Sequence, residues 1–156
     1  MKNWLKLIIS IVLAGLAGFV GSFFTTSSVM SWYPTLIKPS FNPPSWLFGP
    51  VWTILYIMIG VSLYLVWTSK AKAKVKKKAY TIFGVQLILN SLWSIVFFGM
   101  QQPAAAFLVI ALLWISIIYN ALVFYRISKP AGYLLVPYFL WVSFASVLNF
   151  AIWILN

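Results

Sequence analysis

The sequence of 156 residues contains no Asp, Glu, His or Cys. These absences exclude most of the side chains that transfer protons, bind metal ions or form disulfides. Any function must therefore come from aromatic, amide, hydroxyl and backbone groups. The missing carboxylates also leave the 11 Lys and Arg residues, with a formal charge of +11, without an internal salt-bridge partner. Lipid phosphates, solvent or an anionic ligand must supply the counter-charge.

Apolar residues make up 63% of the chain, whereas roughly half is usual for a soluble domain. A helix needs ~20 mostly apolar residues to cross a hydrocarbon core ~30 Å thick. Five stretches of this kind account for nearly the whole chain: residues 5–24, 48–67, 80–99, 104–125 and 131–155. The sequence therefore predicts an all-α integral membrane protein, a bundle of five transmembrane helices that forms one domain over residues 1–156.

The basic residues predict how the bundle is oriented, because short cytoplasmic loops carry an excess of Lys and Arg. With five spans, ten cations fall on the side of the N-terminus, and Lys38 alone falls on the other side. We therefore expect a multi-pass protein of the cell membrane with its N-terminus inside and its C-terminus outside. The six lysines between Lys70 and Lys78 are interpreted as a topology signal resting on anionic lipid headgroups, not as a nucleic-acid site.

The connections between the spans differ in length. Residues 25–47 form a long, aromatic connection with four prolines, which predicts a functional lid, since long loops in compact proteins are usually functional or disordered. The turn from Met100 to Pro103 is short and predicts antiparallel neighbours. Pro103 and Pro130 suit first-turn positions. Pro137 lies inside the last span and should kink it, freeing a carbonyl near Tyr133.

Polar and aromatic residues recur at helical spacing within the spans. For Gln86 and Asn149 we favour hydrogen bonds between helices, whereas for Asn90 such bonding and ligand contact remain equally open. Four tryptophans lie deeper than the interfacial belts, and an aromatic pocket with few polar groups suits a flat hydrophobic ligand. In the first span, Ala14, Gly18 and Ser22 belong to a small-residue face, for which we favour close packing, within the bundle or in a dimer, over ligand contact by Gly18 or Ser22. The four tryptophans are Trp52, Trp93, Trp114 and Trp141.

Three motifs, in this order, resemble the TspO/MBR family, the tryptophan-rich sensory proteins and translocator (peripheral-type benzodiazepine receptor) proteins. Residues 32–56 read WYPTLIKPSFNPPSWLFGPVWTILY, residues 86–99 read QLILNSLWSIVFFG and residues 137–149 read PYFLWVSFASVLN. The similarity covers the whole chain. The cholesterol-recognition motif of the animal proteins is missing, because residues 148–153 supply neither its Tyr nor its basic residue. The chain is therefore similar to the bacterial members, and sterol transport is not expected.

The resemblance implies a homodimer that binds porphyrins such as protoporphyrin IX, and drug-like ligands such as the isoquinoline carboxamide PK11195. It implies no metal and no cofactor besides that ligand. The family pocket lies among helices one, two, three and five beneath the first loop. Some bacterial members promote light-dependent porphyrin breakdown, which makes Trp52 and Trp141 the candidate catalytic residues. The implied ligand-binding residues are Tyr33, Pro44, Trp52, Asn90, Trp93, Trp141, Phe144, Ala145 and Leu148.

Three functions remain open from the sequence. The first is a tetrapyrrole-binding protein that degrades its ligand in light. The second is a transporter of porphyrins or other lipophiles, although the lack of an intramembrane carboxylate or His argues against proton coupling. The third is a ligand sensor without chemistry. Whichever holds, the expected partners are hydrophobic small molecules and membrane lipids, and no nucleic acid.

Overall fold

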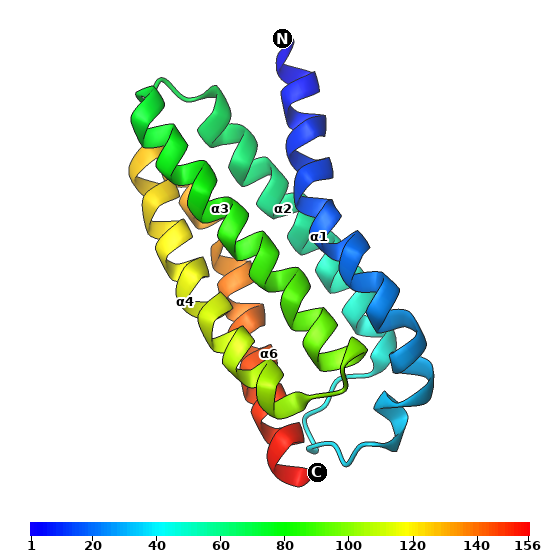
Figure 1. The fold of residues 1–156 in the computed structure, drawn as a ribbon. Helices are drawn as coiled ribbons and strands as arrows, with labels where there is room; N and C mark the ends of the chain where they lie inside the picture. The colour runs from blue at the N-terminus through cyan, green and yellow to red at the C-terminus, as the bar shows by residue number, and fades with distance from the viewer.

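The computed structural model describes residues 1–156, and all of its regular structure is helical (Figure 1). It has five helical segments long and apolar enough to cross a membrane, as the sequence predicts. They are α1 (Asn3–Ser31); η2 (Ser45–Leu47) with α2 (Phe48–Thr68); α3 (Ala73–Ser94) with the π-helical turn η3 (Ile95–Gly99); α4 (Pro103–Ile127); and α5 (Lys129–Tyr133) with α6 (Val136–Leu155).

The first helix is longer than predicted. Residues 25–31, predicted as part of the loop, continue α1 by nearly two turns. The hydroxyls of Thr25, Thr26 and Ser31 donate hydrogen bonds to carbonyls four residues earlier, so these polar side chains are satisfied within the helix. The connection to α2 is therefore shorter than expected and includes the single turn η1 (Tyr33–Thr35).

The helices pack as a bundle in which α1 contacts α2 and α3, and α4 contacts α3, α5 and α6. The short turn after η3 makes α3 and α4 antiparallel neighbours, as predicted (Figure 1). Side chains on the inner faces, such as Ile59, Phe124 and Val142, are completely buried. The N-terminus and the α2–α3 connection lie at one end of the bundle, and the α1–α2 connection and the C-terminus lie at the other (Figure 1).

Glycines set the contact between α1 and α2. A Cβ atom added at Gly60 would lie 2.5 Å from the Cα atom of Ile11, and one added at Gly18 would overlap the ring of Tyr56. Only a residue without a Cβ atom lets the two backbones approach this closely. Ala14 is fully buried on the same side of α1. The small-residue face of α1 therefore packs within the bundle.

The last spanning segment is broken next to Pro137, as predicted. The amide of Leu135 donates to the carbonyl of Gly132, three residues earlier, so the carbonyl of Ala131 loses its helical partner. Ser62 of α2 donates its hydroxyl to that carbonyl at 2.6 Å. Pro137 has no N–H group, so the carbonyl of Tyr133, four residues earlier, also has no helical partner, as expected. Pro103 and Pro130 occupy first-turn positions of α4 and α5.

Candidate functional site

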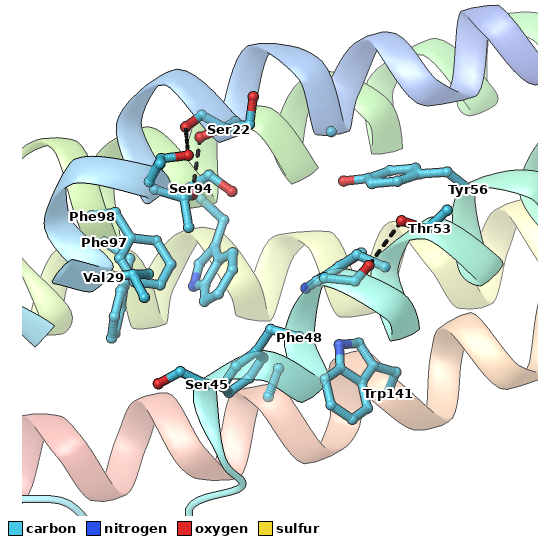
Figure 2. A pocket seen from close by; sticks show the side chains of 18 of the residues that line it. Ser22, Val29, Ser45, Phe48, Thr53, Tyr56, Ser94, Phe97, Phe98 and Trp141 are labelled. Carbon is cyan, nitrogen blue, oxygen red and sulfur yellow. Dashed lines mark hydrogen bonds between the residues drawn. The ribbon is translucent and has the colours of Figure 1, made fainter.

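A cavity of about 700 Å³ lies beside the α1–α2 connection. Its walls come from α1 between Ile11 and Met30, the first half of α2, the end of α3 with η3, and α6 (Figure 2). The α1–α2 contact at Gly18 and Tyr56 borders it on the side away from the connection. No lining residue comes from α4, so the cavity belongs to one side of the bundle.

Aromatic side chains make up much of the wall. Trp52 and Tyr56, one turn apart on α2, have ring centroids 5.5 Å apart and nearly parallel planes. Trp141 from α6 meets Phe48 edge to face at 6.0 Å. Trp93 from α3 completes the set of three indoles on the cavity wall. Flat aromatic walls of this kind favour a ligand that stacks.

The three tryptophans differ in their hydrogen bonds. The indole N–H of Trp93 donates to Asn149 Oδ1 at 2.9 Å, and Asn149 in turn donates to the carbonyl of Pro103 at 2.8 Å. The buried indole N–H of Trp141 has no partner. A buried donor without an acceptor costs about 1–3 kcal/mol. A ligand acceptor would remove that cost once a neighbouring side chain moved aside, because the nitrogen has no exposed surface.

Behind the wall, a chain of hydrogen bonds joins α2, α3 and α6. Tyr56 donates to Asn90 Oδ1 at 2.6 Å, the Asn90 amide donates to the Tyr138 hydroxyl at 2.8 Å, and Tyr138 donates to Gln86 Oε1 at 2.8 Å. Gln86 and Asn149 therefore bond between helices, as favoured from the sequence. Asn90 also bonds between helices, and it lies behind Tyr56, which forms the cavity wall.

The structure brings together most of the nine residues that the resemblance implies. Pro44 is exposed in front of η2, Asn90 is buried behind Tyr56, and Phe144 packs against Trp141 with ring centroids 5.5 Å apart. None of these three lines the cavity. Ligand binding by any of the nine stays a prediction. The six on the wall are Tyr33, Trp52, Trp93, Trp141, Ala145 and Leu148.

The resemblance places helix one at the family pocket, but none of the nine predicted residues lies on α1. One face of this helix lines the cavity over several turns, at a spacing of three to four residues that could have been read as a stripe. Phe19 and Met30 on α1 are 60% and 80% exposed, and Ile57 opposite them on α2 is 46% exposed. The cavity therefore opens sideways between α1 and α2, toward the lipid. The α1 residues include Ile11, Gly15, Gly18, Phe19, Ser22, Thr26 and Met30.

Hydrogen bonds hold the segment between α1 and α2 in place at one end of the cavity. Tyr33 donates to Asn42 Oδ1 at 2.7 Å, and Lys38 donates to the carbonyls of Tyr33 and Leu36, both at 2.9 Å. Burial raises the pKa of Tyr33 to about 12, although the bond to Asn42 opposes the rise. The side chain of Asn156 pairs with both the amide and the carbonyl of Ile37, each at 2.9 Å. These contacts hold the connection in a defined position, and its role as a lid stays a prediction.

Comparison with known proteins agrees with the motifs. The chain matches the TspO/MBR family over residues 9–154. It is 49% identical over 154 residues to the tryptophan-rich protein TspO of Archaeoglobus fulgidus, covering 99% of both chains. It is 51% identical over 155 residues to the protein of that name from Chlorobaculum tepidum, covering 99% of this chain and 98% of the relative. The translocator protein of Homo sapiens is 35% identical over 138 residues, 86% of this chain and 80% of the relative. With its five spanning helices, the chain therefore belongs to the TspO/MBR family and is a multi-pass membrane protein.

Proposed function

We propose that this protein binds a tetrapyrrole such as protoporphyrin IX in the aromatic cavity, and takes drug-like ligands such as PK11195 in the same place. The observation that carries the proposal is the set of three indoles, Trp52, Trp93 and Trp141, around one cavity. The volume of about 700 Å³ lies within the range of ~300–1,000 Å³ that is usual for small-molecule sites.

The chemistry of the wall favours a flat ring without a metal. No Lys or Arg lines the cavity, so its interior selects for shape and stacking over charge. Of the usual axial ligands of haem iron, His and Cys are missing from the sequence, and the one methionine on the wall, Met30, is 80% exposed at its edge. The two tyrosines on the wall, Tyr33 and Tyr56, already donate their hydroxyls to Asn42 and Asn90. A metal-free porphyrin is therefore a better guest than haem.

Light-dependent degradation of the bound porphyrin is the second part of the proposal. A porphyrin excited by light can take an electron from an adjacent indole, and dioxygen is the oxidant that ring opening requires. Trp52 and Trp141 both line the cavity, on α2 and α6. In a site without acids, bases or metal ligands, these two side chains are the candidate reaction partners.

A titration with protoporphyrin IX in the dark and under illumination tests both parts. Replacing Trp52 and Trp141 with Phe should weaken binding roughly two- to tenfold, because stacked aromatic pairs contribute about 0.5–1.5 kcal/mol beyond buried area. The same double variant should lose most of the light-dependent decay of the porphyrin absorbance. Trp153→Phe is the matched control, since Trp153 is exposed on α6 and does not line the cavity.

The two parts fail in different ways. Wild-type protein that does not bind protoporphyrin IX would contradict the whole proposal. Normal binding with wild-type decay in the double variant would contradict the degradation alone.

Transport of a lipophile is the second candidate, favoured by the sideways opening of the cavity between α1 and α2. A ligand that enters from the bilayer can also leave into it. Flux of a labelled tetrapyrrole into sealed vesicles, measured in the dark, distinguishes the candidates. Protein-dependent flux supports transport, and binding without flux supports a site that only holds or degrades its ligand.

A further inference from the structure

A second depression, separate from the aromatic cavity, lies on the first turns of α3. It is shallow and open to the surroundings, and is lined by Ala73, Lys76, Lys77, Tyr80 and Thr81. These residues are three to four positions apart, so they share one face of the helix. We call this depression the α3 groove.

The α3 groove lies at the end of the bundle that carries almost all of the charge. Ten of the 11 cations are in the N-terminal segment, the α2–α3 connection with the start of α3, and the α4–α5 junction, which share that end (Figure 1). No carboxylate side chain exists anywhere in the sequence to balance them. The counter-ion of this end must therefore come from outside the chain.

Within the groove, the two lysines are held differently. The ammonium of Lys76 donates to the carbonyls of Trp67 and Ser69 at 2.8 and 2.7 Å, which fixes its charge at the end of α2. Lys77 is exposed beside it, and so is Lys74 one turn earlier. One cation in a set position and a second that is free to move can together hold a single phosphodiester.

The surface below the lysines is suited to lipid. The span Ala73–Gly99 crosses the membrane, so its first turns lie at headgroup level. Tyr80, 38% exposed, is an interfacial residue one turn deeper. A Cβ atom added at Gly84 would meet nothing within 4 Å, and Ile88 beyond it is 68% exposed. This notch continues the basic groove as an apolar path for an acyl chain.

We propose that the α3 groove binds the headgroup of one anionic phospholipid, such as phosphatidylglycerol. The phosphodiester lies between Lys76 and Lys77, and an acyl chain runs over Gly84. The lipid supplies the negative charge that the chain lacks. A soluble phosphate or a nucleic acid would use the lysines but not the apolar notch, so these partners fit the surface less well.

Native mass spectrometry of delipidated protein in detergent tests the proposal, with dioleoylphosphatidylglycerol and dioleoylphosphatidylcholine as probes. Wild-type protein should bind the glycerol lipid more tightly, and increasing the ionic strength should reduce the difference. Lys77→Gln should weaken binding of the glycerol lipid about fivefold, the usual effect of one basic residue at a lipid surface. Binding of the choline lipid should fall less, because the choline cation already offsets the charge of its phosphodiester.

Two further variants test whether the lipid binds in the groove and not to the basic surface in general. Gly84→Leu fills the notch and should lower binding of both lipids, without touching a charge. Lys129→Gln removes one positive charge at the same end of the bundle, outside the groove. The proposal is overturned if Lys129→Gln weakens binding as much as Lys77→Gln, because the charge would then act as a diffuse patch. It is also overturned if millimolar inorganic phosphate displaces the lipid completely.

Discussion

At the scale of single residues, the tryptophans inside the bundle differ in the hydrogen-bond partners of their indole N–H groups. Trp93 donates to Asn149 Oδ1, and Trp114 donates to the Ser143 hydroxyl at 2.7 Å. Trp141 alone among the three cavity indoles has a buried nitrogen without a partner. Their spacing along the sequence predicts that all of them lie inside the bundle. It does not show which nitrogen is left for a ligand, because that depends on partners from other helices.

Trp141→Phe should change ligand binding more than stability. The substitution removes an unpaired buried donor, so the melting temperature of the free protein should stay the same or increase. Affinity for PK11195, whose carboxamide offers an acceptor, should fall roughly two- to tenfold, the effect of about 0.5–1.5 kcal/mol. Thermal unfolding in detergent and a fluorescence titration measure the two effects.

Trp93→Phe is the matched control for this prediction. It leaves Asn149 Oδ1 buried without its donor, and should lower the free energy of unfolding by about 1–3 kcal/mol. Equal melting temperatures for the two variants would show that the difference in hydrogen bonding has no energetic consequence.

At the scale of helices, α1 and α2 are in close contact at one end of the cavity and are separated where the cavity lies between them. The backbones are closest at Gly60 and Ile11, whereas from Ile11 to Met30 one face of α1 borders the cavity. The sequence shows the small residues at helical spacing. It does not show that α2 is their partner, because a small-residue face fits a neighbouring helix or a second copy equally well.

Gly60→Ala should destabilise the protein, because the new Cβ atom would lie 2.5 Å from the Ile11 backbone. Overpacking of this kind costs about 1–3 kcal/mol, and separating α1 from α2 should also change the cavity. Gly84→Ala is the control, since its Cβ atom meets nothing and Ala favours a helix by about 0.8–1 kcal/mol over Gly. Thermal unfolding of the pair should give shifts of opposite sign.

The lid is the second element whose behaviour follows from its contacts. Asn156 holds Ile37 by two hydrogen bonds between positions far apart in the chain. Asn156→Ala removes both and should make the lid open more often, so that a bound ligand dissociates faster. Stopped-flow release of protoporphyrin IX in the dark measures this. Ser40→Ala, a substitution at an exposed residue of the same segment, is the control. An unchanged release rate in Asn156→Ala would show that the ligand leaves through the opening between α1 and α2.

At the scale of the whole molecule, the apolar composition made the five spans predictable, and the prolines located the break near Pro137. The composition also concealed where the cavity lies. On α1, glycine, serine and threonine recur at helical spacing on the cavity side, but the sequence does not show whether such a face packs against a helix or lines a cavity. For this reason no α1 residue was among the nine predicted ligand-binding residues, whereas Trp52 on α2 and Trp141 on α6 were.

The absence of acidic, His and Cys residues predicts how ligand binding depends on pH. No side chain of the chain has a reference pKa between about 5 and 9, and the cavity wall bears no cation. Affinity for PK11195, an uncharged ligand, should therefore be constant over that interval. At higher pH the lid limits binding, since the pKa of Tyr33 is raised from 10.0 to about 12.

The direction of the high-pH effect follows from this rise. The neutral phenol donates to Asn42, so its contribution to lid closure is fully present below pH 10.0 and is lost as the pH passes about 12. Titrations of wild type and Tyr33→Phe from neutral to strongly alkaline pH test this. The variant should bind less tightly at neutral pH, and the difference from wild type should disappear at the alkaline end. A wild-type inflection between pH 6 and 8 would contradict the prediction, because it would require a titrating group that the cavity and its lid do not contain.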